Sequence, residues 1–354
     1  MLLEENKSLA LLTTFGIGGP ARWFVKAFSE DEVVEATAWT KARGIPLFVL
    51  GGGSNLLVSD DGFGGLVLQV GLRGIGSKNE SDHRDYQVAA GEDWDSFVER
   101  AVKDNCAGIE CLAGIPGTVG GTPVQNVGAY GQEVASVIER VRAFDLVERA
   151  FIELTVAECC FAYRRSRFNT VDRGRFIVTR VDYRLNPGGA PTLRYAELQR
   201  AFPEGFRVNL AEVAAAVRRV RQSKGMLLVE DDPDCRSAGS FFKNPVVLGE
   251  QVRQIAEACG TEPPRFPAGP EPENAGRVKV PAAWLIEQAG FKKGFTMGAA
   301  ALSLRHTLAL INRGDAKAAD ILALAQRISS AVEVRFGIVL EMEPVLVGFG
   351  SAPA

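Results

Sequence analysis

The sequence predicts an α+β protein in which strands and helices alternate irregularly. Three features of the 354-residue chain carry this prediction. A strand–helix–strand pattern occupies residues 22–50, a glycine-dense segment covers residues 112–131, and helices closed by glycine follow from about residue 223 onward. A chain of this length is long enough for two or three packed domains.

The N-terminal pattern begins with a predicted strand at Arg22–Phe28. Ser29 and Glu32 then form a capping-box signature that starts a helix, and Gly44 ends it. The apolar run Leu47–Leu50 predicts a second strand, which leads directly into a glycine loop.

The later elements follow from hydrophobic periodicity and from breaking residues. We expect strands at residues 65–70, 86–90, 141–146, 176–185 and 338–349. The segment 176–185 alternates in residue type, as a half-buried strand does. We expect helices at residues 95–105, 211–222, 250–259, 282–289 and 316–336. The helix at 211–222 ends among cations that suit the negative end of a helix dipole, and we place a domain boundary there: Arg218, Arg219, Arg221 and Lys224.

Composition excludes several classes of function. The formal net charge of −3 gives no basic excess for non-specific nucleic-acid binding. Six cysteines without a C-x-x-C pair, and a start that lacks signal-peptide features, indicate a reduced cytosolic setting. No apolar run approaches the length of a membrane span. With two histidines and no H-E-x-x-H motif, we predict no metal site and no serine–histidine triad, so acid–base chemistry must fall to carboxylate, serine, tyrosine or lysine.

Two glycine-rich loops could hold a nucleotide cofactor. The first follows the strand at 47–50 and reads Gly51, Gly52, Gly53, Ser54, Asn55, Leu56. Glycines let backbone N–H groups approach phosphate oxygens, although a plain turn is the alternative. The second loop, residues 114–131, offers many backbone donors and two amides, Gln125 and Asn126, which suit a pyrophosphate and the edge of a flavin ring. A third candidate, G-x-G-x-x-A at residues 16–21, is followed by a strand-like run and is therefore rejected as a Rossmann motif.

Three further segments carry reactive side chains. Residues 163–168 hold three arginines in four positions, which could bind carboxylate or phosphate or could be a solvated basic edge. The octet at residues 238–245 places Ser240, Lys243 and Asn244 around two phenylalanines, which could alternatively be core residues of a turn. Glu341 lies in an alternating run near the C-terminus, where solvent exposure is the alternative. Cys235 is interpreted as a small buried or loop residue rather than as a reactive thiol.

Taken together these segments resemble the UDP-N-acetylenolpyruvoylglucosamine reductases, also called UDP-N-acetylmuramate dehydrogenases, in the subtype with a substrate-covering tyrosine loop. The matching segments lie in one order along nearly the whole chain: 14–19, 51–57, 113–131, 163–168, 238–245 and 340–341. The resemblance implies an FAD-binding fold of the vanillyl-alcohol-oxidase/PCMH type in two subdomains, plus a smaller α/β substrate-binding domain. The subdomains would be residues 1–74 and 75–222, the second rejoined by 338–354, and the substrate domain would be 223–337.

The resemblance also implies roles for individual residues. Ser240, Arg164 and Glu341 match the catalytic positions. Substrate-side positions are matched by Tyr163, Tyr195, Lys224, Asn244 and Lys279. Non-covalent FAD would be held by the first glycine loop, Gly51 to Leu56, by Arg164 and Ile177, and by residues of the second loop: Ile115, Gly117, Thr118, Gly120, Gly121, Gln125, Asn126, Gly128, Ala129 and Tyr130.

The implied reaction is an NADPH-dependent reduction in peptidoglycan precursor synthesis. Hydride would reach the terminal carbon of an enolpyruvyl ether, and Ser240 would protonate the adjacent carbon while Arg164 and Glu341 engage the carboxylate. We expect a cytoplasmic monomer without nucleic-acid or membrane partners. Two alternatives stay open: a flavin oxidase of the same fold acting on a sugar or alcohol, and a non-catalytic nucleotide-binding protein.

Overall fold

The computed structural model describes residues 1–202, 207–269 and 274–350, which divide into two compact units. Unit 1 comprises Met1–Lys7, Ala21–Gly53 and Gly64–Gln222. Unit 2 comprises Ser8–Pro20, Ser54–Phe63 and the chain from Ser223 onward. Two short N-terminal segments thus pack with the C-terminal third. The three-part division at 74, 222 and 337 remains a prediction.

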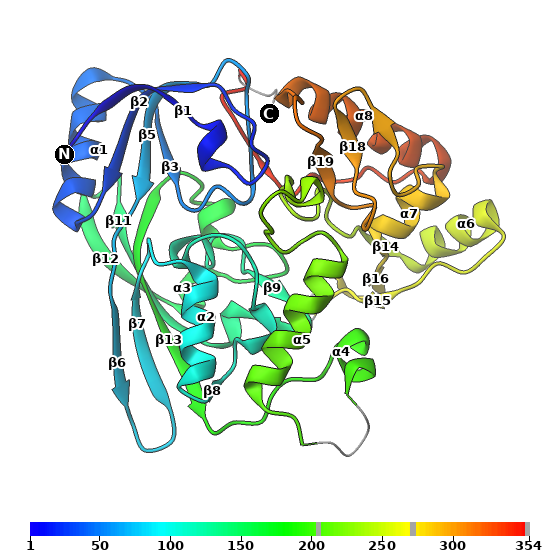
Figure 1. Cartoon of the computed structure of the whole chain (residues 1–354), viewed down its shortest axis with the longest axis horizontal. Helices are drawn as coiled ribbons and strands as arrows, with labels where there is room; N and C mark the ends of the chain where they lie inside the picture. Colours follow the sequence, from blue (N-terminus) through cyan, green and yellow to red (C-terminus); the bar gives the residue numbers. More distant parts are fainter. Residues whose placement is uncertain (203–206, 270–273, 351–354) are drawn as a thin grey trace. The chain divides into compact units, whose positions relative to one another are not determined.

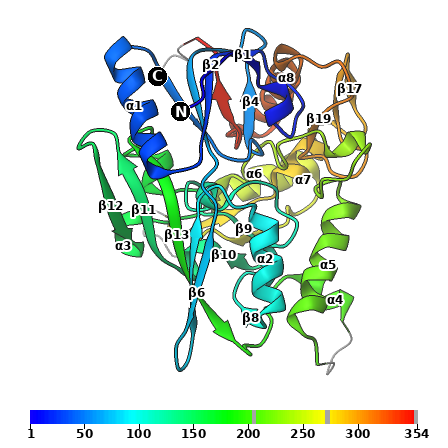
Figure 2. The ribbon, with the colours of Figure 1, turned by 60° about the vertical axis from the view of Figure 1, so that its left-hand side comes forward.

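Two larger sheets form most of the strand structure of unit 1. The first has the order β1–β2–β5–β3, with β1 (Glu4–Ser8), β2 (Pro20–Ala27), β5 (Phe63–Val70) and β3 (Leu47–Leu50). The second has the order β12–β11–β13–β7–β6, with β12 (Ala150–Thr155), β11 (Ile138–Asp145), β13 (Phe176–Pro187), β7 (Arg84–Ala89) and β6 (Ile75–Asn79). Figure 2 shows β12, β11 and β13 side by side in that order. Short pairings add β8 (Cys106–Ala107) to β13 and join β9 (Gly128–Ala129) to β10 (Gln132–Glu133). The predicted strands from residue 22 to residue 185 are therefore confirmed.

The helices of unit 1 are α1 (Glu30–Arg43), α2 (Trp94–Lys103), α3 (Val156–Cys159), α4 (Ala196–Ala201) and α5 (Leu210–Ser223). The predicted helices at 95–105 and 211–222 are confirmed to within two residues, whereas the sequence does not predict the short helices α3 and α4. Ser29 Oγ accepts the N–H of Glu32 at 3.2 Å, and Gly44 ends α1 in the left-handed conformation. One of the cations at the end of α5 also makes a specific ion pair. Arg218 pairs with Asp95 of α2 at 2.6 Å, so it joins two helices rather than only complementing a dipole.

Strand β13 shows why this sheet has one buried face. Val181, Tyr183 and Leu185 are buried in the core of unit 1, whereas Arg180, Asp182 and Arg184 alternate with them on the other face. Each fully buried large apolar side chain contributes about 1.5–3 kcal/mol. The Tyr183 hydroxyl also hydrogen-bonds Thr122 Oγ1 at 2.7 Å, which ties the glycine-dense segment to the sheet.

Unit 2 has its own core around three helices, α6 (Gly249–Cys259), α7 (Ala282–Gln288) and α8 (Ala318–Phe336). Helix α8 packs against α6 and α7, which Figure 1 draws in yellow to orange. The small sheets have the orders β14–β16–β15, β17–β18–β19 and β20–β4. Their strands are β14 (Val246–Leu248), β16 (Arg277–Lys279), β15 (Phe266–Pro267), β17 (Thr296–Met297), β18 (Ala300–Leu302), β19 (Leu310–Asn312), β20 (Val345–Val347) and β4 (Leu56–Val58). Short 3-10 helices in the two units are Ala10–Leu12, Glu110–Leu112, Val119–Gly121, Val134–Ser136, Arg167–Asn169 and Pro233–Cys235.

The strand predicted at 338–349 is mostly wrong. Only β20 forms, paired in parallel with β4, and upstream of it Met342 makes a single bridge to Phe242. Pro344 separates these two pairings, and because proline lacks an N–H group it cannot donate to a continuous ladder.

The rejected motif at residues 16–21 has a packing role. A Cβ on Gly19 would lie 2.2 Å from the carbonyl oxygen of Asp60, so the two chain segments approach backbone to backbone. A strand, β2, follows these glycines, as the sequence predicts. Among the described residues, no helix is both long enough and apolar enough to cross a membrane.

Candidate functional site

The two predicted cofactor loops meet in unit 1. A Cβ on Gly52 would lie 2.6 Å from Gly117 Cα, and one on Gly51 would lie 2.9 Å from Thr118 Oγ1. Real Cβ atoms do not make such contacts, so glycine at both positions is what lets the loops touch. Gly117, with φ of 129°, and Gly53, with φ of 67°, adopt backbone conformations that favour glycine. We call these residues the glycine cradle: Gly51, Gly52, Gly53, Gly117 and Thr118.

The glycine cradle contains a buried polar atom that the protein does not satisfy. Thr118 Oγ1 is buried and has no hydrogen-bond partner within residues 1–202, 207–269 and 274–350. A buried hydroxyl without a partner costs about 1–3 kcal/mol, which a ligand oxygen could recover. The cradle is also rigid, because Trp94 N–H donates to Gly117 O at 3.1 Å and Trp94 Nε1 donates to Leu112 O at 3.1 Å. These features fit a phosphate-bearing cofactor such as FAD.

The rest of the second loop is partly used by the protein itself. The N–H groups of Gly120 and Gly121 donate to Ala90 and Thr118, at 2.8 and 2.9 Å. The buried Asn126 side chain donates to Glu133 Oε2 at 2.9 Å. It also donates to the Ala162 carbonyl and accepts the Ala135 N–H. Asn126 therefore braces the loop, and its amide N–H groups are already engaged.

Other predicted cofactor residues have contrasting exposures. Ile177 is fully buried in β13, whereas Gly128 and Ala129 are half-buried in β9. Tyr130, with φ of 50°, lies edge-to-face against Tyr195 with ring centroids 5.2 Å apart.

The remaining predicted cofactor residues are divided between the units. Ser54, Asn55 and Leu56 belong to unit 2, and Ile115 and Gln125 are half-buried in unit 1.

Arg164 lies at the tip of a tight turn in unit 1. Ala162 and Arg165 exchange backbone hydrogen bonds of 3.0 and 3.1 Å, so Tyr163 and Arg164 are the central pair. Arg164 has φ of 56°, in the left-handed region that costs a non-glycine residue about 1 kcal/mol. Its Nη1 donates to Gly128 O at 2.8 Å, which directs the guanidinium to the second glycine loop. The other arginines of this run differ, since Arg165 is exposed and Arg167 pairs with Asp172.

Ser240 lies in unit 2 between two anchored residues. On one side Thr14 Oγ1 donates to the Ser237 carbonyl at 2.6 Å. On the other side the Phe241 N–H donates to Leu308 O at 2.8 Å, and its ring is fully buried. Ser240 itself is half-buried, and its hydroxyl makes no hydrogen bond to any described residue. The phenylalanines are thus core residues, as the alternative reading of the octet has it, and they hold the serine in place.

Glu341 forms an ion pair that the sequence does not predict. Lys243 Nζ donates to Glu341 Oε1, and the Lys243 N–H donates to the Glu341 carbonyl at 2.9 Å. The bridge between Phe242 and Met342 brings these two segments together. The Glu341 side chain is 71% exposed, so the pair lies at the surface of unit 2. In the sequence, the lysine of the octet at residues 238–245 is the one feature that points to this pair.

The remaining substrate-side residues fall in both units. Asn244 Oδ1 accepts the Ala282 N–H at 2.9 Å and so caps α7, and Lys279 ends β16. Lys224 is half-buried just after α5. Tyr195 is 38% exposed before α4 in unit 1. Each of the two units therefore holds some of the predicted residues.

Burial shifts the pKa values of Arg221 and Cys235, which lie near the predicted site segments. Burial lowers the pKa of Arg221, which is nearly inaccessible and donates from Nε to Gly114 O at 2.9 Å. This arginine at the end of α5 thus supports the second glycine loop. Burial also raises the pKa of Cys235, whose thiol donates to Leu227 O, so the interpretation of Cys235 as a buried residue is confirmed.

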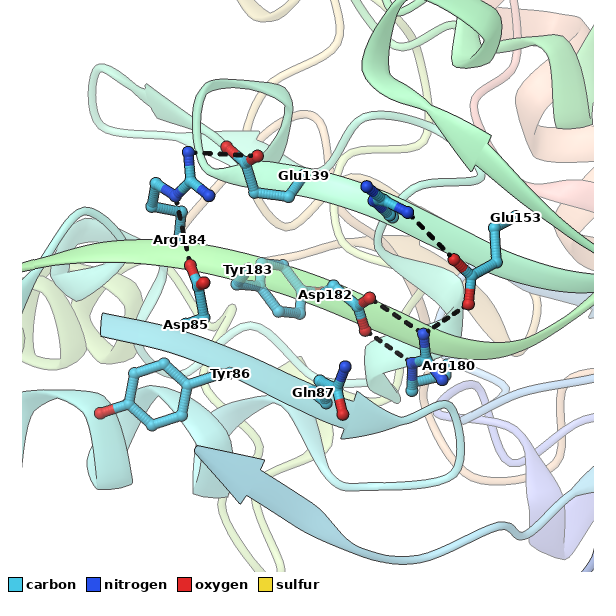
Figure 3. A pocket seen from close by; sticks show the side chains of 10 residues that line it. Asp85, Tyr86, Gln87, Glu139, Glu153, Arg180, Asp182, Tyr183 and Arg184 are labelled. Atoms are coloured by element: carbon cyan, nitrogen blue, oxygen red, sulfur yellow. Dashed lines mark hydrogen bonds and ion pairs between the residues drawn. The ribbon is translucent and has the colours of Figure 1, made fainter. Parts of the chain in front are cut away.

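A polar hollow of about 430 Å³ lies on the outer face of the second sheet of unit 1 and contains none of the predicted site residues. Figure 3 shows that its arginines are paired. Arg180 contacts Asp182 at 2.6 Å and Glu153 at 2.8 Å. Arg184 reaches Asp85 at 3.2 Å and Glu139 at 3.4 Å. The hollow is therefore lined by ion pairs within this sheet, and Arg180 and Arg184 are already paired with carboxylates.

Comparison with known proteins decides the family. Residues 231–347 match the C-terminal domain of UDP-N-acetylenolpyruvoylglucosamine reductase, and residues 21–150 match an FAD binding domain. The UDP-N-acetylenolpyruvoylglucosamine reductase of Thermobifida fusca is 46% identical, over 97% of this chain and 98% of the relative. The chain belongs to this reductase family. The reductase of Streptomyces coelicolor is 45% identical over 97% of this chain and 90% of its own length.

A solved structure agrees with the family assignment. The crystal structure of UDP-N-acetylenolpyruvylglucosamine reductase from Thermus caldophilus is 27% identical, with a TM-score of 0.66 and coverage of 98% of this chain and 100% of that one. The predicted family, the FAD-binding fold and FAD as the cofactor are thereby confirmed.

Proposed function

We propose that this chain reduces UDP-N-acetylglucosamine enolpyruvate to UDP-N-acetylmuramate in peptidoglycan precursor synthesis, using FAD and NADPH. The observation that carries the proposal is the 46% identity to a reductase of this name over nearly the whole of both chains. The glycine cradle supports it, because it offers close backbone approach and an unsatisfied hydroxyl, the features that a bound dinucleotide would use.

FAD, when bound, supplies hydride that originates from NADPH. The residues to hold it are those of the glycine cradle, together with the second loop that Asn126 and Arg221 brace. Arg164 is directed toward that loop by its bond to Gly128, and its guanidinium is the group suited to the substrate carboxylate. When hydride adds to the terminal carbon of the enolpyruvyl group, negative charge develops on the adjacent carbon and on this carboxylate, which a fixed cation stabilises.

Ser240 protonates that adjacent carbon. Its hydroxyl is held at a fixed place by Ser237 and Phe241, and a carbanion is basic enough to take a proton from a weak acid. Glu341 orients or polarises the same carboxylate. Its pairing with Lys243 supports this role, because the lysine offsets the repulsion between two carboxylates.

Substrate-side contacts are assigned to Tyr163, Tyr195, Lys224, Asn244 and Lys279. The chain acts as a cytoplasmic monomer. Size-exclusion chromatography with light scattering tests the monomer, and a dimer mass would contradict it.

The test is to follow NADPH absorbance under anaerobic conditions, first without and then with UDP-N-acetylglucosamine enolpyruvate. We expect one equivalent of NADPH per bound flavin to be consumed, followed by turnover only when the enolpyruvyl substrate is added. Oxygen-dependent turnover with a simple sugar would instead identify an oxidase. Colourless protein that binds no FAD would identify a non-catalytic nucleotide-binding protein.

A further inference from the structure

Glu110 is buried and is not among the predicted site residues. It accepts a hydrogen bond from Thr192, three residues before Tyr195. We infer that Glu110 is a positioning residue for Tyr195, because it fixes Thr192, the residue at which the tyrosine loop leaves the core of unit 1. The inference rests on the proposed function, since it assumes that Tyr195 covers the substrate. Glu110 is not one of the catalytic or substrate-side residues, so a Glu110 variant can fail its test while the proposed function still holds.

Glu110 is fully buried and accepts hydrogen bonds from three separate segments. Oε2 accepts the Gly108 N–H at 2.8 Å. Oε1 accepts the Gln132 Nε2 at 2.8 Å and the Thr192 N–H at 2.8 Å. A buried carboxylate is tolerated only when such donors surround it, so the loss of a single acceptor oxygen leaves a buried donor unsatisfied.

Thr192 is held through all of its polar groups. Its N–H binds Glu110, its Oγ1 accepts from Gln132 Nε2 at 3.2 Å, and its carbonyl accepts from Cys111 Sγ at 3.2 Å. Gln132 Oε1 in turn accepts the Cys111 N–H at 2.7 Å, which closes the network. Thr192 is half-buried and belongs to a connection between β13 and α4, but these hydrogen bonds tie it to buried residues of unit 1.

The chain goes from half-buried at Thr192 to exposed within three residues. Arg194 and Tyr195 are exposed, and the Tyr195 ring rests edge-to-face on Tyr130. Leu198 in α4 is fully buried again. The exposed stretch is thus short and fixed at both ends, so the place of Thr192 sets the reach of Tyr195. Since Gln132 lies two residues from Tyr130, the same network also fixes the ring on which Tyr195 rests.

The experiment uses Glu110→Gln in the FAD-bound protein. The amide keeps the size of the side chain, but in either orientation its NH₂ group faces a donor, Gly108 N–H or Thr192 N–H. We expect the KM for the enolpyruvyl substrate to rise about tenfold. Reduction of the flavin by NADPH without substrate should keep its rate. Trypsin cleavage after exposed Arg194 should become several-fold faster.

The decisive arm is a double-mutant cycle with Tyr195→Ala. If Glu110 acts through Tyr195, Glu110→Gln changes KM little in the Tyr195→Ala background. An equal effect in both backgrounds, or an unchanged KM for Glu110→Gln alone, would overturn the inference. If Tyr195→Ala itself leaves KM unchanged, the proposed role of Tyr195 fails instead, and the inference falls with it.

A matched control is Asp145→Asn on β11. Asp145 is 1% exposed and accepts from Arg175, Val147 and Glu148, so its substitution also disturbs a buried carboxylate. It should lower thermal stability without raising KM or speeding cleavage at Arg194. If Glu110→Gln does not retain FAD, Thr192→Val replaces it in the same cycle. This variant removes only the contact with Gln132, and a KM unchanged from the unsubstituted protein would contradict the inference.

Discussion

The glycine cradle of unit 1 and the Ser240 turn of unit 2 are built by opposite means. Apart from the Thr118 hydroxyl, the cradle offers backbone groups, and its close packing requires residues without a side chain, since a Cβ on Gly52 would lie 2.6 Å from Gly117 Cα. The Ser240 turn, residues 237–243, instead depends on side chains that reach distant segments, since Thr14 Oγ1 donates to the Ser237 carbonyl and Lys243 Nζ pairs with Glu341. Adding a Cβ to a glycine of the cradle should therefore disturb cofactor binding, whereas removing a side-chain group near Ser240 should disturb the chemical step.

The sharpest test of this contrast removes one oxygen from unit 2. Ser240→Ala should lower the rate of substrate reduction about 10³-fold, because the developing carbanion loses its proton donor. FAD content and flavin reduction by NADPH should stay unchanged, since they depend on the cradle. Stopped-flow spectroscopy separates the two half-reactions. Normal turnover would exclude Ser240 as the proton donor.

Adding a methyl group to the glycine cradle of unit 1 should impair FAD binding rather than the protonation step. Gly52→Ala places its Cβ against the Gly117 backbone, which cannot move as a side chain can, so FAD affinity should fall at least about 100-fold. Fluorescence titration of the apoprotein with FAD measures this. Gly64→Ala is the control, because a Cβ there meets nothing within 4 Å. Tight FAD binding by Gly52→Ala would contradict the assignment of the cradle.

A smaller effect is expected from removing the charge beside Glu341. Lys243→Gln should raise the KM for the enolpyruvyl substrate about tenfold, because Glu341 then repels the substrate carboxylate. Steady-state kinetics at two salt concentrations should show that the defect shrinks as salt increases. Exposed Lys292→Gln in the same unit is the charge-matched control and should leave KM unchanged.

The smallest effect concerns stability alone and lies outside both sites. Arg142 lowers the pKa of Glu30 from its ordinary value of 4.5 through a bidentate pair of 2.8 and 2.9 Å. A lowered pKa means that this stabilisation is present above the unfolded pKa and is lost as pH falls through the folded one. Glu30→Gln should therefore cost about 1–2 kcal/mol above about pH 5, and the difference from wild type should vanish in more acid solution. Denaturant unfolding at several pH values measures it, and a constant difference would contradict the pairing.

Much of the fold could be predicted because its signals are local. The helix from Glu30 to Arg43 follows from Ser29 and Gly44, and the burial pattern of β13 follows from alternation. The segment 338–349 shows the limit of such signals. Its alternation resembles a strand, but whether a ladder forms depends on partners, and here β4 pairs with only three residues.

The sequence by itself determined the capped helices, the alternating strands and the glycine loops, since each depends on neighbours a few residues away. Tertiary structure alone decided that Gly52 meets Gly117, that Lys243 pairs with Glu341, and that Glu110 fixes Thr192. These contacts join residues up to 98 positions apart. No local preference encodes them, because they exist only once packing has brought the segments together.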